Sequence, residues 1–176
     1  LEKIGGIPLL EVLMTRINQS KLLDEIIVAT TLSKKDDILC KWLDDNQVRY
    51  FRGSEKNVLK RFYDCIANLS DKPDLIVRLT ADDPFKDPEL IDKAIKIIIE
   101  SKNIDYVSNT LNPTYPEGLD VEVFTYDSLK KAFSKARLES EKEHVTPYIW
   151  KNSKIFNIVN FEMQPNLSHW RWTIDK

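Results

Sequence analysis

The sequence LIVRLTADDP at residues 75–84 is the stretch that decides the fold class. Its apolar start is typical of a strand in a parallel sheet, because such a strand is buried on both faces. Two adjacent carboxylates, Asp82 and Asp83, follow at once, and Pro84 ends the strand. In open α/β sheets, ligands bind at the carboxyl ends of the strands. Crowded carboxylates cost free energy unless a cation compensates them, so we expect a divalent metal and a phosphate ligand here.

Helical and strand-like patterns alternate on both sides of this stretch. Ser33 with Asp36 fits a capping box, and Asp87 before a proline fits a helix N-cap. The expected helices are 8–17, 33–43, 58–69 and 87–98, and the expected strands are 26–30, 48–52, 75–80 and 105–109. This alternation predicts an α/β fold, a three-layer αβα sandwich with a mainly parallel sheet.

The pattern changes after residue 110. The expected strands are 119–126, 155–161 and 169–174, and the expected helices are 128–137 and 140–151. Ser140 and Glu143 have the spacing of a second capping box. Because there is no internal repeat and no interdomain linker, we predict a single domain over residues 1–176.

Composition and charge limit the classes of function. Of the 176 residues, 42% are hydrophobic and 31% are charged, as in ordinary globular proteins. The formal net charge of -2 gives no electrostatic reason to expect binding to nucleic acid or to an anionic membrane. No stretch approaches the roughly 20 apolar residues that a membrane helix needs. Cys40 and Cys65 lie in helix-like segments without CxxC spacing, which favours free thiols and a cytoplasmic location.

Seven motifs occur in one order along nearly the whole chain. They are IGGIPLL (4–10), FRGS (51–54) with the helix start that follows it, RLTADDP (78–84), YVSNT (106–110), YPEGLDVEVF (115–124), EHVTPY (143–148) and RWTID (171–175). Together they resemble the cytidylyltransferase superfamily. The branch that they resemble most contains the spore-coat polysaccharide protein SpsF, a relative of the enzymes that make CMP-KDO and CMP-sialic acid.

The resemblance implies a nucleotide-diphospho-sugar transferase fold of the glycosyltransferase-A type and a nucleotidyl transfer. CTP and a sugar or sugar acid would give a CMP-sugar and pyrophosphate for surface polysaccharide biosynthesis. The sugar hydroxyl would attack the α-phosphorus in line, so catalysis would consist of positioning and electrostatic stabilisation. Mg²⁺ suits this chemistry because it binds through one or two carboxylates and takes its other ligands from phosphate and water.

The same resemblance assigns roles to single residues. Asp82 and Asp175 align with the catalytic, metal-binding aspartates, whereas we expect Asp83 to be an N-cap or a solvent-facing acid. The residues assigned to nucleotide binding are Arg52, Gly53, Ser54, Arg61 and Arg78. Alternatives stay open for each: Arg78 could pair with Asp82 or Asp120, segment 52–54 could be an ordinary turn with Ser54 as cap, and Arg61 could lie on a solvated helix face.

The sugar side of the site is assigned to Glu117, Asp120, Glu122 and His144. Asp120 and Glu122 share one face of a strand, because side chains alternate, and could bind hydroxyls or supply a base. The alternative for this pair is a cross-strand salt bridge. His144 would contact the acceptor, although its neighbour Glu143 is equally well explained by the capping box.

One departure from the family pattern concerns the N-terminus. The family's triphosphate loop and first strand precede the Gly-Gly segment, and this chain begins at Leu1, inside the far edge of that loop. We therefore expect a truncated sequence that is not competent for catalysis by itself. Two other functions remain open: a glycosyltransferase that uses a nucleotide-sugar donor, and a non-catalytic nucleotide-binding module. A homodimer formed through the segment after residue 110 is also expected.

Overall fold

The computed structural model describes residues 1–174 and contains two compact units, each assembled from segments distant in sequence. Unit 1 consists of residues 1–23, 76–124 and the described residues from 157 onward. Unit 2 consists of residues 24–75 and 125–156. The prediction of a single domain stays a prediction.

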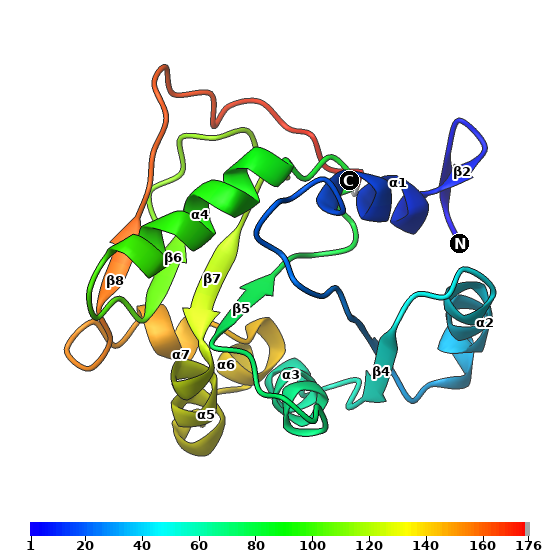
Figure 1. The fold of residues 1–176 in the computed structure, drawn as a ribbon, viewed down its shortest axis with the longest axis horizontal. Coiled ribbons are helices and arrows are strands. Elements are labelled where there is room, and N and C mark those ends of the chain that lie inside the picture. The colour runs from blue at the N-terminus through cyan, green and yellow to red at the C-terminus, as the bar shows by residue number, and fades with distance from the viewer. Residues whose placement is uncertain (175–176) are drawn as a thin grey trace. The chain divides into compact units, whose positions relative to one another are not determined.

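The sheet of unit 1 has four strands. Their order is β5 (Leu75–Arg78), β7 (Glu122–Thr125), β6 (Tyr106–Ser108) and β8 (Ile158–Asn160). β6 and β8 are parallel, whereas β7 is antiparallel to β6, with Ser108 opposite Glu122. In Figure 1 the arrows of β5 and β7 also run in opposite directions. β7 is therefore the reversed strand of a mixed sheet.

Helix α4 (Pro88–Glu100) lies across one face of this sheet, in front of β6 in Figure 1. Asp87 caps it by accepting a hydrogen bond from the Glu89 backbone N–H at 2.9 Å, which confirms the predicted N-cap. Its buried residues recur at helical spacing: Ile91, Ala94, Ile95 and Ile98. Burying each of the isoleucines contributes about 1.5–3 kcal/mol to folding, so this face holds the helix on the sheet.

The N-terminal part of unit 1 is a hairpin followed by α1 (Leu9–Ile17). Its strands are β1 (Lys3–Ile4) and β2 (Ile7–Pro8), which pair antiparallel. Gly5 and Gly6 have φ of 55° and 87°, as a two-residue turn of type I′ requires. The Gly-Gly of the first motif is therefore a hairpin turn.

Unit 2 is built on the parallel pair β3 (Val28–Thr31) and β4 (Tyr50–Gly53). Between them lie the short 3-10 turn η1 (Lys34–Asp36) and α2 (Asp37–Asp45). Helix α3 (Val58–Ala67) packs on both strands. Helix α3 also packs against two of the three helices that complete the unit, which are α5 (Tyr126–Lys135), α6 (Glu139–His144) and α7 (Pro147–Trp150). The rings of Tyr63 and Phe133 stack between α3 and α5 at 4.1 Å.

The α/β class and the mainly parallel sheet are confirmed, with β7 as the exception. The strand predicted at 169–174 is wrong: the structure has only an isolated bridge there, between Glu117 and Arg171. The helix predicted at 140–151 is also wrong as a single element, because Val145, with φ 71°, separates α6 from α7.

Neither predicted capping box forms, although Ser33 is the predicted N-cap and its hydroxyl accepts from the Lys35 backbone N–H at 3.4 Å. The Asp36 carboxylate accepts hydrogen bonds from Thr30 and Thr31 instead of reaching the backbone of Ser33. In the second case α6 begins earlier than expected. No capping box forms there, because Leu138 at the N-cap has no side-chain acceptor, and the Glu141 carboxylate instead accepts from the backbone N–H groups of Arg137 and Leu138.

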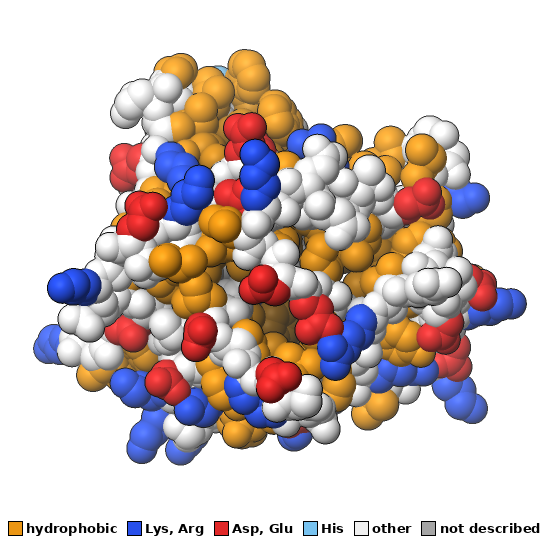
Figure 2. Space-filling model, viewed as in Figure 1, with side chains coloured by type: hydrophobic (Ala, Val, Ile, Leu, Met, Phe, Trp, Pro, Cys, Tyr) orange, Lys and Arg blue, Asp and Glu red, His pale blue; other side chains and the backbone are white. Residues whose placement is uncertain are grey.

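Within residues 1–174, no helix has both the length and the apolar character needed to cross a membrane. On the face shown in Figure 2, acidic and basic side chains are interspersed. This agrees with the small net charge of -2.

Candidate functional site

The two carboxylates that follow β5 have opposite environments. The side chain of Asp82 is exposed, and within residues 1–174 it makes no hydrogen bond or ion pair. Asp83 is buried, and its Oδ2 accepts hydrogen bonds from the Thr80 hydroxyl at 2.6 Å and from Lys86 Nζ at 2.9 Å. The expectation that Asp83 is an N-cap or a solvent-facing acid is therefore wrong, because a fully buried lysine holds it inside.

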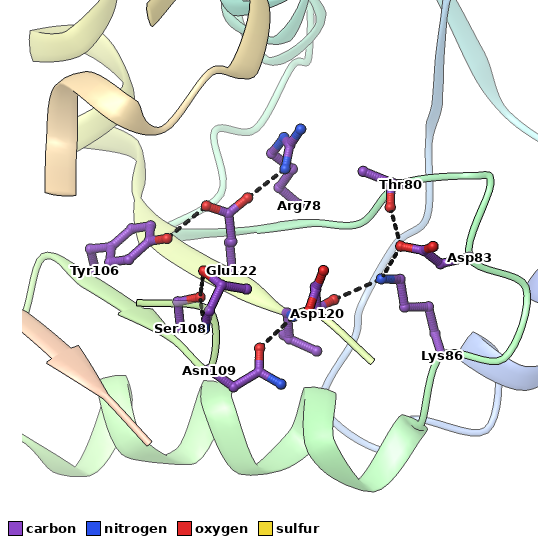
Figure 3. A network of polar contacts seen from close by, with 11 residues as sticks. Arg78, Thr80, Asp83, Lys86, Tyr106, Ser108, Asn109, Asp120 and Glu122 are labelled. Carbon is purple, nitrogen blue, oxygen red and sulfur yellow. Dashed lines mark hydrogen bonds and ion pairs between the residues drawn. The ribbon is translucent and has the colours of Figure 1, made fainter. Parts of the chain in front are cut away.

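Lys86 is the residue of this site that the sequence analysis missed. Its side chain has 0% exposure, and Nζ donates to Asp83 Oδ2 and to the backbone carbonyl of Asp120, each at 2.9 Å. Figure 3 shows Lys86 extending between these two partners. The only sequence signal was the spacing of three residues between an acid and a lysine, which most often marks a solvated surface pair.

A second network surrounds the buried carboxylate of Glu122 in β7 (Figure 3). Its Oε2 contacts Arg78 Nη1 at 2.5 Å, and its Oε1 accepts a hydrogen bond from the Tyr106 hydroxyl at 2.6 Å. Arg78 thus pairs with Glu122 and not with Asp82 or Asp120. Burial, and then the Glu122 charge, raise the pKa of Tyr106 far above its ordinary range. The tyrosine therefore stays a neutral donor to Glu122.

Asp120 lies just before β7, in a loop that Asn109 holds. The Asn109 amide donates to the Leu119 carbonyl at 2.9 Å and accepts from the Val121 backbone N–H at 2.9 Å. Asp120 is exposed to solvent. Protein atoms nevertheless surround its carboxyl group closely enough that desolvation raises the pKa of Asp120. Among its neighbours, Lys86 opposes that rise while nearby carboxylates add to it.

The predicted pair of Asp120 and Glu122 is therefore divided between two roles. Glu122 forms the cross-strand salt bridge that was the alternative interpretation. Asp120 is the member whose carboxylate remains exposed. Of the two, Asp120 is the better candidate for a group that meets an acceptor hydroxyl.

The segment around Glu117 lies against the C-terminal part of unit 1. The Glu117 backbone N–H donates to Trp170 O at 2.9 Å, and the Trp172 N–H donates to Glu117 O at 2.8 Å. Gly118 has φ 99°, and an added Cβ would lie 3.0 Å from the Trp172 backbone, so a side chain would be strained here. The exposed Glu117 carboxylate faces Arg171 Nε at 3.7 Å.

The predicted nucleotide-binding segment 52–54 belongs to unit 2. The Arg52 guanidinium donates to the carbonyls of Thr31 and Ser33, each at 2.8 Å, and forms an ion pair with Asp37 at 2.8 Å. All three of its nitrogens are engaged within the unit. Arg52 therefore ties β4 to the start of the α2 segment, and its predicted contact with a nucleotide would require these bonds to rearrange.

Close packing explains the glycine of this segment. A Cβ on Gly53 would lie 2.9 Å from the Arg61 side chain and 2.9 Å from the Phe51 ring. Ser54 caps the turn that leads into α3, because its hydroxyl accepts from the Asn57 backbone N–H at 3.0 Å, and Asn57 in turn caps α3 by accepting from the Lys60 N–H.

Arg61 has an unpaired buried donor within the described part of the chain. One of its Nη atoms donates to Ser54 O at 2.8 Å, but within residues 1–174 its buried Nε has no partner. Desolvation lowers its pKa, with Asp36 opposing that effect.

Two predicted residues remain to be placed. His144 is exposed at the end of α6 and belongs to unit 2. Asp175 lies outside the described residues, so its predicted role stays a prediction. Unit 1 thus carries Arg78, Asp82, Glu117, Asp120 and Glu122, and unit 2 carries Arg52, Gly53, Ser54, Arg61 and His144.

A divalent metal remains compatible with Asp82. Among residues 1–174, no three His, Cys, Asp or Glu side chains are grouped so that they could form a metal site. Mg²⁺ does not need such a group, since one or two carboxylates together with substrate phosphates and water suffice. An exposed carboxylate without a hydrogen-bond partner meets that requirement.

Comparisons with known proteins identify the family. Residues 1–174 match the family model described as cytidylyltransferase. The chain is 44% identical over 162 residues to an uncharacterised protein of Methanocaldococcus jannaschii, covering 92% of this chain and 64% of that protein. It is 34% identical over 183 residues to the spore coat polysaccharide biosynthesis protein SpsF of Bacillus subtilis, covering 99% of this chain and 73% of SpsF. The chain thus spans about two thirds to three quarters of these relatives.

Solved structures agree with this result. A cytidylyltransferase from Leptospira borgpetersenii superimposes with a TM-score of 0.91 at 30% identity, covering 99% of this chain and 73% of that one. A CMP-2-keto-3-deoxy-manno-octonic acid synthetase complexed with CTP shares the fold, with a TM-score of 0.69 at 13% identity over 93% of this chain and 82% of that one. The chain belongs to the cytidylyltransferase family.

Proposed function

We propose that this chain is the catalytic part of a CTP-dependent nucleotidyltransferase that activates a sugar or sugar acid. One observation carries the proposal: in a member of the cytidylyltransferase family, Asp82 is an exposed carboxylate without a hydrogen-bond partner in residues 1–174, just after β5. The resemblance to SpsF favours a product used in surface polysaccharide synthesis. A homodimer stays a prediction.

Asp82 would hold Mg²⁺, together with Asp175 according to the family pattern. When bound, the ion would offset the negative charge of the triphosphate and of the leaving pyrophosphate. The role of Asp82 itself is to present its carboxylate outward at a fixed place. Neighbouring Asp83 cannot take that role, because both Thr80 and Lys86 donate to its carboxylate.

Asp120 would accept a hydrogen bond from the acceptor hydroxyl and orient its oxygen for in-line attack on the α-phosphorus. A raised pKa brings this carboxyl closer to the range in which it can also take the proton. Arg78, fixed by Glu122 through one Nη, would offer its remaining N–H groups to phosphate. The nucleotide contacts predicted for Gly53, Ser54 and Arg61 and the acceptor contacts predicted for Glu117 and His144 stay predictions, and the contact predicted for Arg52 would require its bonds to Thr31, Ser33 and Asp37 to rearrange.

The test is isothermal titration of CTP, ATP, GTP and UTP into the full-length protein with Mg²⁺. Asp82→Asn is the test variant. Asp74→Asn is a matched control, because Asp74 is an exposed acid at the opposite end of β5. We expect binding selective for CTP that weakens at least tenfold in Asp82→Asn and is unchanged in Asp74→Asn.

The other outcomes separate the rival functions. Tight binding of a UDP- or GDP-sugar without preference for CTP would assign the protein to the glycosyltransferases. The absence of any nucleotide binding would overturn both the cytidylyltransferase and the glycosyltransferase hypotheses and would leave a non-catalytic module. If CTP binds selectively, a screen of acceptors for release of pyrophosphate then identifies the sugar.

A further inference from the structure

The pair formed by Lys86 and Asp83 connects two loops that carry exposed acids. Asp83 immediately follows Asp82, in the loop after β5. Through Lys86 Nζ it is joined to the backbone carbonyl of Asp120, in the loop before β7. The Asp120 carbonyl itself sits between two residues that Asn109 holds, Leu119 and Val121. The connection therefore runs between two anchored pieces of backbone (Figure 3).

The location of this pair is unusual for charged groups. The Lys86 side chain has 0% exposure and that of Asp83 has 8%. Taking two charges out of water is unfavourable, and an apolar pair of similar volume often stabilises a protein equally well. Stability alone therefore does not account for a charged pair here, whereas a requirement for directional bonds does. Nζ supplies two directed donors, which an apolar side chain cannot.

Lys86 is fixed at its own backbone as well. Its carbonyl accepts a hydrogen bond from Arg16 Nε at 2.8 Å, which comes from α1. The residue that follows, Asp87, caps α4, and α4 is packed on the sheet. Lys86 therefore connects the two acidic loops from a rigid base.

We propose that Lys86 is a positioning residue that, through Asp83, holds the loop of Asp82 and the loop of Asp120 in a fixed arrangement for metal and acceptor. The inference rests on the proposed function, since it concerns the same site. Residues that orient a metal ligand without touching the metal typically change metal affinity 10–100-fold when they are replaced. Loss of this connection should therefore weaken metal binding more than it weakens nucleotide binding.

The test uses a double variant, Lys86→Met with Asp83→Asn, in the full-length protein. Removing both charges avoids leaving one buried and unpaired, so the variant is expected to fold. The measured quantities are the Kd for Mn²⁺ at saturating CTP, obtained by electron paramagnetic resonance, and the Kd for CTP without metal. We expect Mn²⁺ affinity to fall about tenfold or more and metal-free CTP binding to change by less than about twofold.

A control separates positioning from general loosening of unit 1. Ile91→Val removes one methylene from the buried face of α4 and changes no charge. We expect it to lower the melting temperature without changing the Kd for Mn²⁺. Unchanged Mn²⁺ affinity in the double variant, or an equal loss in Ile91→Val, would overturn the inference. A wild type that binds neither CTP nor Mn²⁺ would instead overturn the proposed function.

Discussion

At the scale of single residues, Asp82 and Asp83 are neighbours of identical chemistry in opposite environments. We predict that Asp83→Asn lowers the free energy of unfolding by about 3 kcal/mol, because it leaves the buried ammonium of Lys86 without its counter-charge. Asp82→Asn should change the free energy of unfolding by less than about 0.5 kcal/mol, since its side chain is exposed and unbonded within residues 1–174. Urea denaturation of both variants measures this difference.

The two variants serve as controls for each other, because they make the same substitution one residue apart. Nucleotide binding should show the reverse order, with Asp82→Asn the more damaging when both proteins are folded. Equal destabilisation by the two substitutions would contradict the division of roles between these acids.

Asp120 allows a prediction about pH. Its pKa is raised above the ordinary value of 3.8, mainly by desolvation, so the folded state binds this proton more tightly than the unfolded state. The resulting stability is fully present below about pH 4 and is lost as the pH rises through the raised pKa. Asp120→Asn should therefore melt at a higher temperature than the wild type at pH 7, with no difference below about pH 4. Melting curves between pH 3.5 and 8 measure this effect, and a variant that is less stable at pH 7 would contradict it.

The sequence placed Asp82 correctly after β5, but it placed Asp120 inside a strand at 119–126, whereas β7 begins only at Glu122 and Asp120 lies in the loop before it. It could not show which of two adjacent acids is buried. That is decided by Lys86, whose Nζ reaches a backbone carbonyl 34 residues away. The sequence also did not identify the partner of Arg78, because Glu122 lies across the sheet in β7 and strand pairing is a property of the tertiary structure.

At the scale of elements, the turn between α6 and α7 contains a strained backbone conformation at a residue other than glycine. Val145 is fully buried and has φ 71° and ψ -57°, the geometry of a γ-turn, which its branched side chain strongly disfavours. The Thr146 N–H closes this turn on the His144 carbonyl at 2.8 Å. The turn therefore sets the direction that the chain takes after His144, the last residue of α6.

We predict that Val145→Gly is more stable than Val145→Ala, although it removes more volume. Alanine keeps the penalty for positive φ, about 1–2 kcal/mol, and glycine does not. Chemical denaturation of both variants should therefore give a free energy of unfolding about 1 kcal/mol higher for glycine. In an ordinary helix the order is reversed, because glycine is less favourable there than alanine by about 1 kcal/mol. Greater stability of the alanine variant would show that the chain is helical through this position.

Elements with a strong local signal were predicted well, and those defined by distant contacts were not. Helix α4 has an N-cap, a proline in its first turn and four buried residues at helical spacing. Segment 169–174 alternates as a strand would, but within residues 1–174 its only strand-like pairing is a single bridge at Arg171. Pairing partners are a property of the tertiary structure, and alternation alone cannot supply them.

At the scale of the whole molecule, the order of seven short motifs carried more information than any one of them. Several mark positions where the backbone or a buried group leaves few alternatives, such as the Gly5–Gly6 turn, Gly118 with its positive φ, and Asn109, whose side-chain amide makes two backbone hydrogen bonds. The family could therefore be recognised from the sequence, whereas the reversed direction of β7 appears only in the structure.

The last prediction concerns the stability of the whole protein in the presence of ligand. A ligand that binds only the folded state stabilises it by about 2.7 kcal/mol at a concentration of 100 times its Kd. For a protein of about 150–250 residues, each kcal/mol shifts the melting temperature by about 2–4 °C. CTP with Mg²⁺ should therefore raise the melting temperature of the full-length protein by about 5–11 °C at that concentration.

Two comparisons, one between nucleotides and one with and without Mg²⁺, show whether the shift in melting temperature comes from the proposed site. ATP, GTP and UTP at the same concentration should give smaller shifts, and the shift with CTP should shrink in Asp82→Asn but not in Asp74→Asn. Equal shifts with all four nucleotides would show that the phosphates alone are recognised, which would contradict selective use of CTP. A shift with CTP that does not depend on Mg²⁺ would instead remove Asp82 from its proposed role, because an exposed carboxylate beside a triphosphate repels it unless a cation lies between them.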